Sequence, residues 1–131
     1  MSGLQELNVY FGGKLGDVGD SNHLTDDDGK ILKHYVNNCN GFKLKELFDI
    51  KDKFKVNSLH IHKITKISDF FEISFISDDN IIEGIESFKD NQYIIATQFH
   101  PEIMLRYKNK YAINFWNNLR KDLINIKRKR N

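Results

Sequence analysis

The spacing of apolar residues along this chain predicts a helix near each end. Residues 3–11 place Leu4, Leu7 and Phe11 at helical spacing, and Gly12-Gly13 then ends the predicted helix. The following residues, 14–30, are polar and are predicted to form a loop. A second, longer amphipathic helix is predicted near the end by apolar residues that step by three and four positions: Ala112, Phe115, Trp116, Leu119, Leu123 and Ile126.

The middle of the chain has the shorter period that is typical of strands. The pattern predicts strands over residues 31–36, 53–59, 70–76, 81–88 and 93–99. The third and fourth of these flank the turn Ser77-Asp78-Asp79-Asn80, so we expect them to form an antiparallel hairpin. The fifth is a continuous apolar run, which is typical of a strand that is buried on both faces.

Polar side chains follow this apolar run directly. His100 and Glu102 flank Pro101, the only proline in the sequence. Proline ends a strand because it has no N–H for the ladder and its φ is fixed. An imidazole and a carboxylate are therefore expected side by side beyond the strand, where they could form the base and orienting groups of a nucleophilic triad. Equally, they could be a strand-end pair that hydrogen-bonds to loops.

Length and composition limit the protein to a small set of classes. At 131 residues, with 40% hydrophobic residues, the chain is expected to be one globular domain. Its sequence has no apolar run of about 18 residues and no apparent leader, so neither a membrane span nor secretion is predicted. The single cysteine excludes an internal disulfide and fits a reducing, cytoplasmic setting.

Charge is nearly balanced, with a formal net value of +2, and names no partner. Much of it comes from the tail Lys127-Arg128-Lys129-Arg130. A solvated helix end, whose cations suit the negative pole of the helix dipole, is favoured there over contact with nucleic acid.

Other chemical candidates are weaker than His100 and Glu102. Cys39 lies in a predicted turn without the strand, glycine turn and helix that expose a thiol nucleophile. Residues 26–29 lack the alternation of a calcium loop and predict a solvated turn. His60 and His62 could share a strand face, but no further ligand lies near, so no metal is predicted. Ser58 lacks a glycine-flanked elbow and is expected to line a pocket.

Four segments resemble the class I glutamine amidotransferases, and they occur in that family's order. The strand ending in Thr97-Gln98-Phe99-His100-Pro101-Glu102 resembles the family's C-terminal signature. The segment 3–9, followed by Gly12-Gly13-Lys14-Leu15, resembles the helix after the nucleophile. The segment 82–86, Ile-Glu-Gly-Ile-Glu, resembles the preceding strand. Val56-Asn57-Ser58-Leu59-His60 resembles one branch, the γ-glutamyl-γ-aminobutyrate hydrolases.

This resemblance implies a fold and a set of roles. The fold would be an α/β three-layer sandwich with a mostly parallel sheet, and no cofactor or metal would be needed. His100 would be the base that deprotonates a cysteine nucleophile, and Glu102 would orient its imidazole. The resemblance further implies that four residues bind the γ-glutamyl substrate: Gln5, Asn57, Ser58 and His60.

The chain departs from the family pattern in two places. The elbow pattern Cys-x-Gly-x-Gln falls on Met1-Ser2-Gly3-Leu4-Gln5, so Met1 stands where the nucleophile belongs. A thioether cannot form a thiolate. Where the branch continues His-His-Gln, this chain has His60-Ile61-His62, which leaves its detailed substrate preference open.

We therefore expect residues 1–131 to be the C-terminal portion of a glutamine amidotransferase domain, truncated at its N-terminus. Such a chain is expected to be inactive alone. It could be a remnant, or a piece of a split enzyme whose partner, a separate N-terminal half, carries the cysteine elbow. The alternative is a non-catalytic module that still binds a small γ-glutamyl molecule or another protein.

Overall fold

The computed structural model describes residues 3–17, 29–58 and 62–130. Its helices are α1 (Gly3–Tyr10), α2 (Lys43–Phe48), the 3₁₀ turn η2 (Lys89–Asn91), α3 (Pro101–Arg106) and α4 (Lys110–Arg130). Its strands are β1 (Lys14–Asp17), β2 (His34–Asn38), β3 (Lys53–Val56), β4 (His62–Lys66), β5 (Glu72–Ser77), β6 (Ile82–Ser87) and β7 (Ile94–Thr97). Five strands form one sheet in the order β3-β2-β5-β6-β7, and β1 pairs with β4 in a smaller ribbon.

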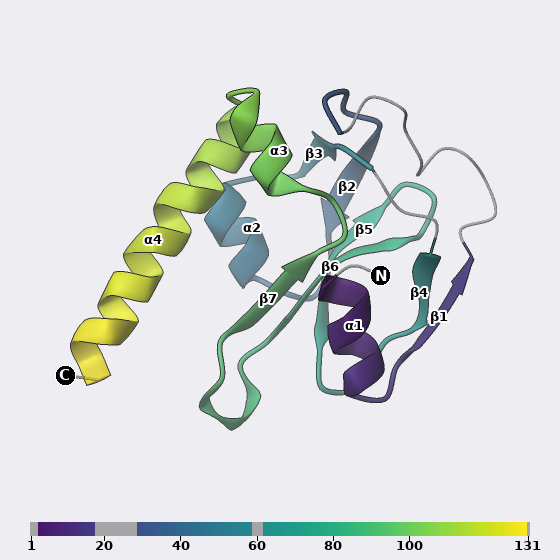
Figure 1. Cartoon of the computed structure of the whole chain (residues 1–131), viewed down its shortest axis with the longest axis horizontal. Coiled ribbons are helices and arrows are strands. Elements are labelled where there is room, and N and C mark those ends of the chain that lie inside the picture. Colours follow the sequence, from purple (N-terminus) through teal and green to yellow (C-terminus); the bar gives the residue numbers. More distant parts are fainter. Residues whose placement is uncertain (1–2, 18–28, 59–61, 131) are drawn as a thin grey trace.

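Helices cover both faces of the five-stranded sheet, so the predicted α/β layering is confirmed (Figure 1). On one face, α2, α3 and α4 pack against the strands, and Phe48 of α2 stacks on Phe115 of α4 with ring centroids 4.4 Å apart. On the other face, Leu4 of α1 packs with Ile85 of β6 and with Ile64 of the small ribbon. The sheet is thus the middle of three layers.

The expectation of a mostly parallel sheet is wrong. All strand pairs among the described residues are antiparallel. Short connections explain the direction of two of these pairs, β5–β6 and β6–β7, because a parallel pair needs a crossover of about a dozen residues or more. Only residues 78–81 join β5 to β6, and only residues 88–93 join β6 to β7. After so short a connection, the next strand can only run beside the previous one in the opposite direction.

The long elements agree with the sequence pattern, while several short ones were missed. Both predicted helices and the hairpin are present, and their ends differ from the predicted positions by at most four residues. The predicted loop over residues 14–30 is partly wrong, since β1 occupies its first four residues, and residues 18–28 lie outside the described part. Five short elements had no expected counterpart: β1, α2, β4, η2 and α3. Each has only three to six residues, too few to show a clear period.

A buried carboxylate ties α2 to the sheet. Glu86 on β6 is 2% exposed, and its Oε1 accepts hydrogen bonds from the backbone N–H groups of Phe42 (2.6 Å) and Lys43 (2.9 Å). Its Oε2 accepts from the Leu44 N–H (2.9 Å) and the Ser74 hydroxyl (2.8 Å). These N–H groups belong to the first turn of α2, where helices have unpaired donors. A side chain from a neighbouring strand therefore takes the place of an N-cap.

Because Gly41 has no side chain, the Glu86 carboxylate can pack directly against its backbone. A Cβ at Gly41 would lie 2.6 Å from the Ser74 hydroxyl oxygen and 2.7 Å from Cδ of Glu86. Both distances are shorter than real Cβ contacts, and both neighbours are held by buried hydrogen bonds. Glycine is needed here for close approach.

Replacing Glu86 should destabilise the protein strongly. Glu86→Ala leaves three N–H groups and a hydroxyl without their buried acceptor, so we expect a loss of about 3 kcal/mol in the free energy of unfolding. Urea denaturation would measure it, with the exposed β5 residue as a matched control in Glu72→Ala, expected to change stability by about 0.5 kcal/mol or less. Equal effects of both substitutions would contradict the capping role.

A second polar cluster joins α4 to α2 and to the start of β7. Oδ2 of Asp122 accepts hydrogen bonds from Lys43 Nζ (3.0 Å) and from the Tyr93 hydroxyl (2.8 Å). Burial alone would raise the pKa of Asp122, but these two donors and the Lys43 charge outweigh it and hold that pKa below its ordinary value of 3.8. Burial, together with the nearby Asp122, raises the pKa of Tyr93.

The Asp122 cluster should make stability dependent on acid pH. Because the folded-state pKa lies below the unfolded value, the contribution is present above about pH 4 and is lost as pH falls through the folded pKa. Asp122→Asn should cost at most about 1 kcal/mol at pH 7, since the Asp122 side chain is 26% exposed, and much less at pH 3. Urea midpoints across this range would test it, with the exposed Asp52→Asn as control. An unchanged difference between pH 7 and pH 3 would reject the ionic contribution.

Candidate functional site

The His100 and Glu102 side chains meet just beyond the end of β7. His100 Nδ1 lies 2.7 Å from Glu102 Oε1, which confirms the contact expected from the sequence. Pro101 occupies the first turn of α3, where its fixed φ suits a helix start and its missing N–H is not needed. The strand therefore stops, and a helix begins within a few residues. The His100 side chain is 33% exposed, so its imidazole is open to small molecules.

This pair can act as a base. When Nδ1 carries the proton and donates it to Glu102, the lone pair of Nε2 is left to accept a proton from another group. The carboxylate also stabilises the imidazolium that then forms. The arrangement therefore has the geometry that the base and the orienting group of a nucleophilic triad require.

Asn57 binds the backbone of His100 rather than its ring. Its Oδ1 accepts a hydrogen bond from the His100 N–H (2.8 Å), and its Nδ2 donates to the His100 carbonyl (3.1 Å). Nδ2 also donates to the carbonyl of Gly29 (3.0 Å). Asn57 has 0% exposure, so these contacts occur in a dry environment. The structure brings Asn57 and His100 together across 43 positions of sequence.

Gln5 reaches the same region from α1. Its Nε2 donates to Oε1 of Gln98 (2.8 Å) and to the carbonyl of His62 (2.9 Å). Gln98 stands two residues before His100, and Gln5 is only 2% exposed. α1 therefore begins next to the end of β7, as Figure 1 shows. The sequence offered no sign that Gln98 is the group to which Gln5 binds.

The remaining predicted site residues differ in how far they can be placed. Ser58 follows Asn57 and is fully buried. His60 and Met1 lie outside the described residues. His62 begins β4, where its Nε2 is 3.8 Å from Oδ1 of Asp17 on β1.

Strand direction places Cys39 away from this site. In an all-antiparallel sheet of order β3-β2-β5-β6-β7, strands β3 and β7 run the same way and end at the same edge. β2 runs in the opposite direction, so Cys39, which follows it, lies at the far edge. Cys39 is exposed and is the only cysteine in the sequence. It cannot be the thiol that His100 activates within this chain.

A second histidine–carboxylate pair lies at the same edge as His100. His34 Nε2 is 2.8 Å from Glu83 Oε1, and their side chains are 14% and 1% exposed. The carbonyl of Glu83 also accepts the N–H of Gln98 (2.7 Å), which fixes the chain just before His100. Sequence reasoning missed this pair because the two residues are 49 positions apart and neither forms a motif with the other.

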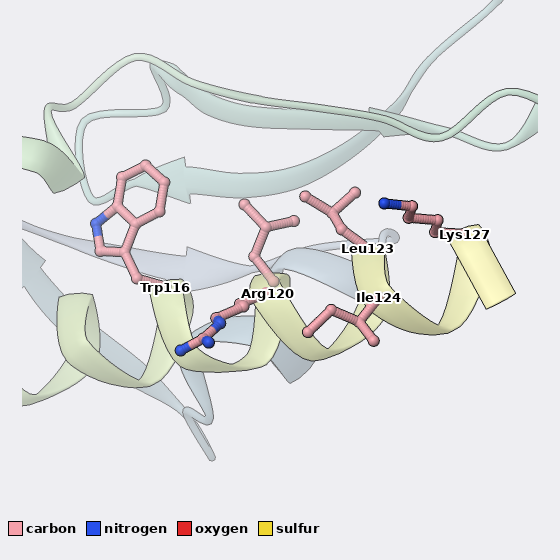
Figure 2. A pocket seen from close by; sticks show the side chains of 6 residues that line it. Trp116, Arg120, Leu123, Ile124 and Lys127 are labelled. Carbon is pink, nitrogen blue, oxygen red and sulfur yellow. The ribbon is translucent and has the colours of Figure 1, made fainter.

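One hollow borders the open edge of β7, and a second lies along α4. A cavity of about 200 Å³ next to Glu102 is lined by Leu44, Ile95, Ala96, Thr97, Pro101, Glu102, Phe115 and Trp116. A groove of about 370 Å³ follows α4 and is lined by Trp116, Leu119, Arg120, Leu123, Ile124 and Lys127. Figure 2 shows Trp116 and Leu123 on the same side of the helix. Trp116 belongs to both hollows, so together they form one apolar surface. In the described residues no helix is long and apolar enough to cross a bilayer.

Comparison with known proteins identifies relatives along most of the chain. A GMP synthase (glutamine-hydrolysing) of Dictyostelium discoideum is 34% identical over 109 residues, which cover 82% of this chain and 14% of that protein. A candidate glutamine amidotransferase of Schizosaccharomyces pombe is 38% identical over 108 residues, covering 79% of this chain and 41% of the relative. The chain thus spans less than half the length of these curated relatives.

Solved structures show the same fold. A candidate GMP synthase component from Thermoplasma acidophilum matches with a TM-score of 0.59 and 20% identity, over 89% of this chain and 56% of the other. A glutamine amidotransferase from Thermotoga maritima matches with a TM-score of 0.59 and 17% identity, over 92% of this chain and 46% of the other.

The family model described as Peptidase C26 matches residues 2–102, a range that contains Gln5, Asn57, His100 and Glu102. On this match and the relatives above, the chain belongs to the Peptidase C26 family of class I glutamine amidotransferase-like proteins.

Proposed function

We propose that this chain supplies the base and its orienting carboxylate to a site that hydrolyses γ-glutamyl amides. The observation that carries the proposal is the 2.7 Å contact between His100 Nδ1 and Glu102 Oε1 at a strand end. Membership of a glutamine amidotransferase-like family supplies the reaction class. Glutamine or a γ-glutamyl-γ-aminobutyrate type of substrate fits the Val56–His60 resemblance, and the setting we propose is the cytoplasm.

In the proposed reaction a cysteine thiol from outside the described residues gives its proton to Nε2 of His100. The thiolate attacks the amide carbonyl, and the tetrahedral intermediate expels the amine, which takes the proton back from the imidazolium. Water, activated by His100 in turn, hydrolyses the thioester and releases the γ-glutamyl acid. Glu102 holds the imidazole in the required tautomer and offsets its positive charge. From the family resemblance we propose that the substrate side of the site is lined by Gln5, Asn57, Ser58 and His60.

We further propose that the complementary part of the domain, which carries the nucleophile, binds along β7. As the last strand in the sheet order, β7 has an outer edge without a strand partner in the described part. Its residues Ile94, Ile95 and Ala96 are apolar and half-buried, and no proline or charge protects the edge. The apolar surface around Trp116 lies beside it. A strand added there in parallel with β7 would end next to His100, where the thiol is needed.

A non-catalytic γ-glutamyl-binding module is the second candidate. The observation that favours it is Met1, which stands at the nucleophile position in the family pattern and cannot ionise.

The chain alone should not turn over γ-glutamyl substrates. Without a thiol beside His100, we expect release of ammonia from glutamine to equal the uncatalysed rate, and Cys39→Ala to change nothing. A coupled glutamate assay would measure it. Turnover that is abolished by Cys39→Ala would make Cys39 the nucleophile and overturn our assignment.

A complementary segment should bind to the β7 and Trp116 surface. The part of the S. pombe relative outside its matched region should associate with the chain and, if it brings a thiol to His100, restore turnover that His100→Ala abolishes. Trp116→Ser should weaken association at least tenfold, measured by calorimetry. The matched control is Tyr10→Ser on α1, an aromatic residue that is 82% exposed. Equal binding by both variants would place the interface elsewhere.

A further inference from the structure

Asn57 forms a closed hydrogen-bonded ring with one residue of the site. Its amide accepts from the His100 N–H at 2.8 Å and donates to the His100 carbonyl at 3.1 Å, as a neighbouring strand would. Because the ring includes both peptide groups that flank the His100 Cα, it fixes the direction in which the imidazole leaves the backbone. His100 needs such support, since its backbone (φ −111°, ψ 86°) belongs to neither β7 nor α3.

The same contacts leave Asn57 little capacity for a ligand. An asparagine amide has two N–H donors, and here they point to the carbonyls of His100 and Gly29. Its exposure is 0%. A substrate carboxylate would need one of these donors, and taking it would break the ring around His100.

We propose that Asn57 is a positioning residue that keeps the His100 imidazole on Glu102, and that it does not contact the substrate. The effect of Asn57 on catalysis rests on the function proposed above. Its effect on the orientation of the imidazole rests on the hydrogen bonds alone. The ring joins the end of β3 to the end of β7 and, through Gly29, to a third segment. The orientation of the imidazole therefore depends on three parts of the chain that are far apart in sequence.

The chain offers a matched control in Asn8. This residue is also 0% exposed, donates through Nδ2 to a carbonyl (Lys66, 3.0 Å) and accepts through Oδ1 from an N–H (Ser68, 2.8 Å). Its partners belong to the end of β4 and the connection that follows it, not to His100. Asn8→Ala removes two buried hydrogen bonds of the same kind as the three that Asn57→Ala removes, but only the second substitution removes support from the site.

The test is a histidine ¹⁵N NMR titration of the intact chain. The spectrum resolves which ring nitrogen carries the proton, and the His100 signals are assigned by their loss in His100→Gln. In the wild-type chain we expect neutral His100 to carry its proton mainly on Nδ1, facing Glu102. Asn57→Ala should shift most of that population to Nε2–H and give signals close to those of Glu102→Gln. Asn8→Ala should leave the His100 signals as in the wild-type chain.

Asn57→Ser provides a neutral second variant in case Asn57→Ala does not fold. The serine hydroxyl has a single donor and can pair with only one of the two carbonyls that Asn57 binds, so we expect a partial shift of the tautomer. Wild-type His100 signals in either folded Asn57 variant would overturn the proposal, as would an equal shift in Asn8→Ala.

If the complementary segment restores activity, kcat and KM distinguish a positioning role of Asn57 from contact with the substrate. Asn57→Ser should lower kcat about tenfold or more and leave KM within about twofold. A raised KM with unchanged kcat and an unchanged tautomer would assign Asn57 to the substrate and overturn our inference. A complex with no activity at all would reject the proposed function but leave the NMR result valid.

Discussion

The structure depends on the buried carboxylate of Glu86. It satisfies the first turn of α2 from β6, and it also binds the hydroxyl of Ser74 on β5. Without this anchor, α2 would present unpaired N–H groups to an apolar layer, a condition that costs more than the short helix gains from its own hydrogen bonds. The packing of Phe48 on Phe115, and with it the place of α4, depends on α2 being held in this position.

The direction of the strands in the five-stranded sheet, and not closeness in sequence, brings the residues of the candidate site to one edge. Because strand direction alternates strictly, β3 and β7 end at the same edge although they are the outermost strands of the sheet. The segment after β7 crosses this edge, with Phe99 beside Phe54 of β3, and Asn57 can then bind the backbone of His100. The N-terminal turn of α1 reaches this edge through Gln5 and Gln98. The residues around His100 thus come from the end of β3 and the start of α1, and neither segment shows from its sequence alone that it contacts the end of β7.

Much of this could be predicted from the sequence, for identifiable reasons. The Glu102 contact followed from Pro101, whose ring leaves few ways to continue a strand. Both long helices followed from their period. The sheet direction was wrong because it came from the family resemblance, while the pairings were decided by the short connections of this chain. The roles of Glu86, Gln98 and the His34–Glu83 pair could not be read from the sequence, because each depends on residues more than ten positions away that only folding brings together.

These separations also have a consequence for the order of folding. The β5–β6 hairpin closes a loop of a few residues, so it can form early and at little entropic cost. The contact between Gln5 and Gln98 closes 93 positions of chain, and that between Asn57 and His100 closes 43. Chain entropy therefore makes the surroundings of His100 among the last parts of the molecule to assemble. The precision of the imidazole is therefore a property of the completed fold and not of any fragment of it.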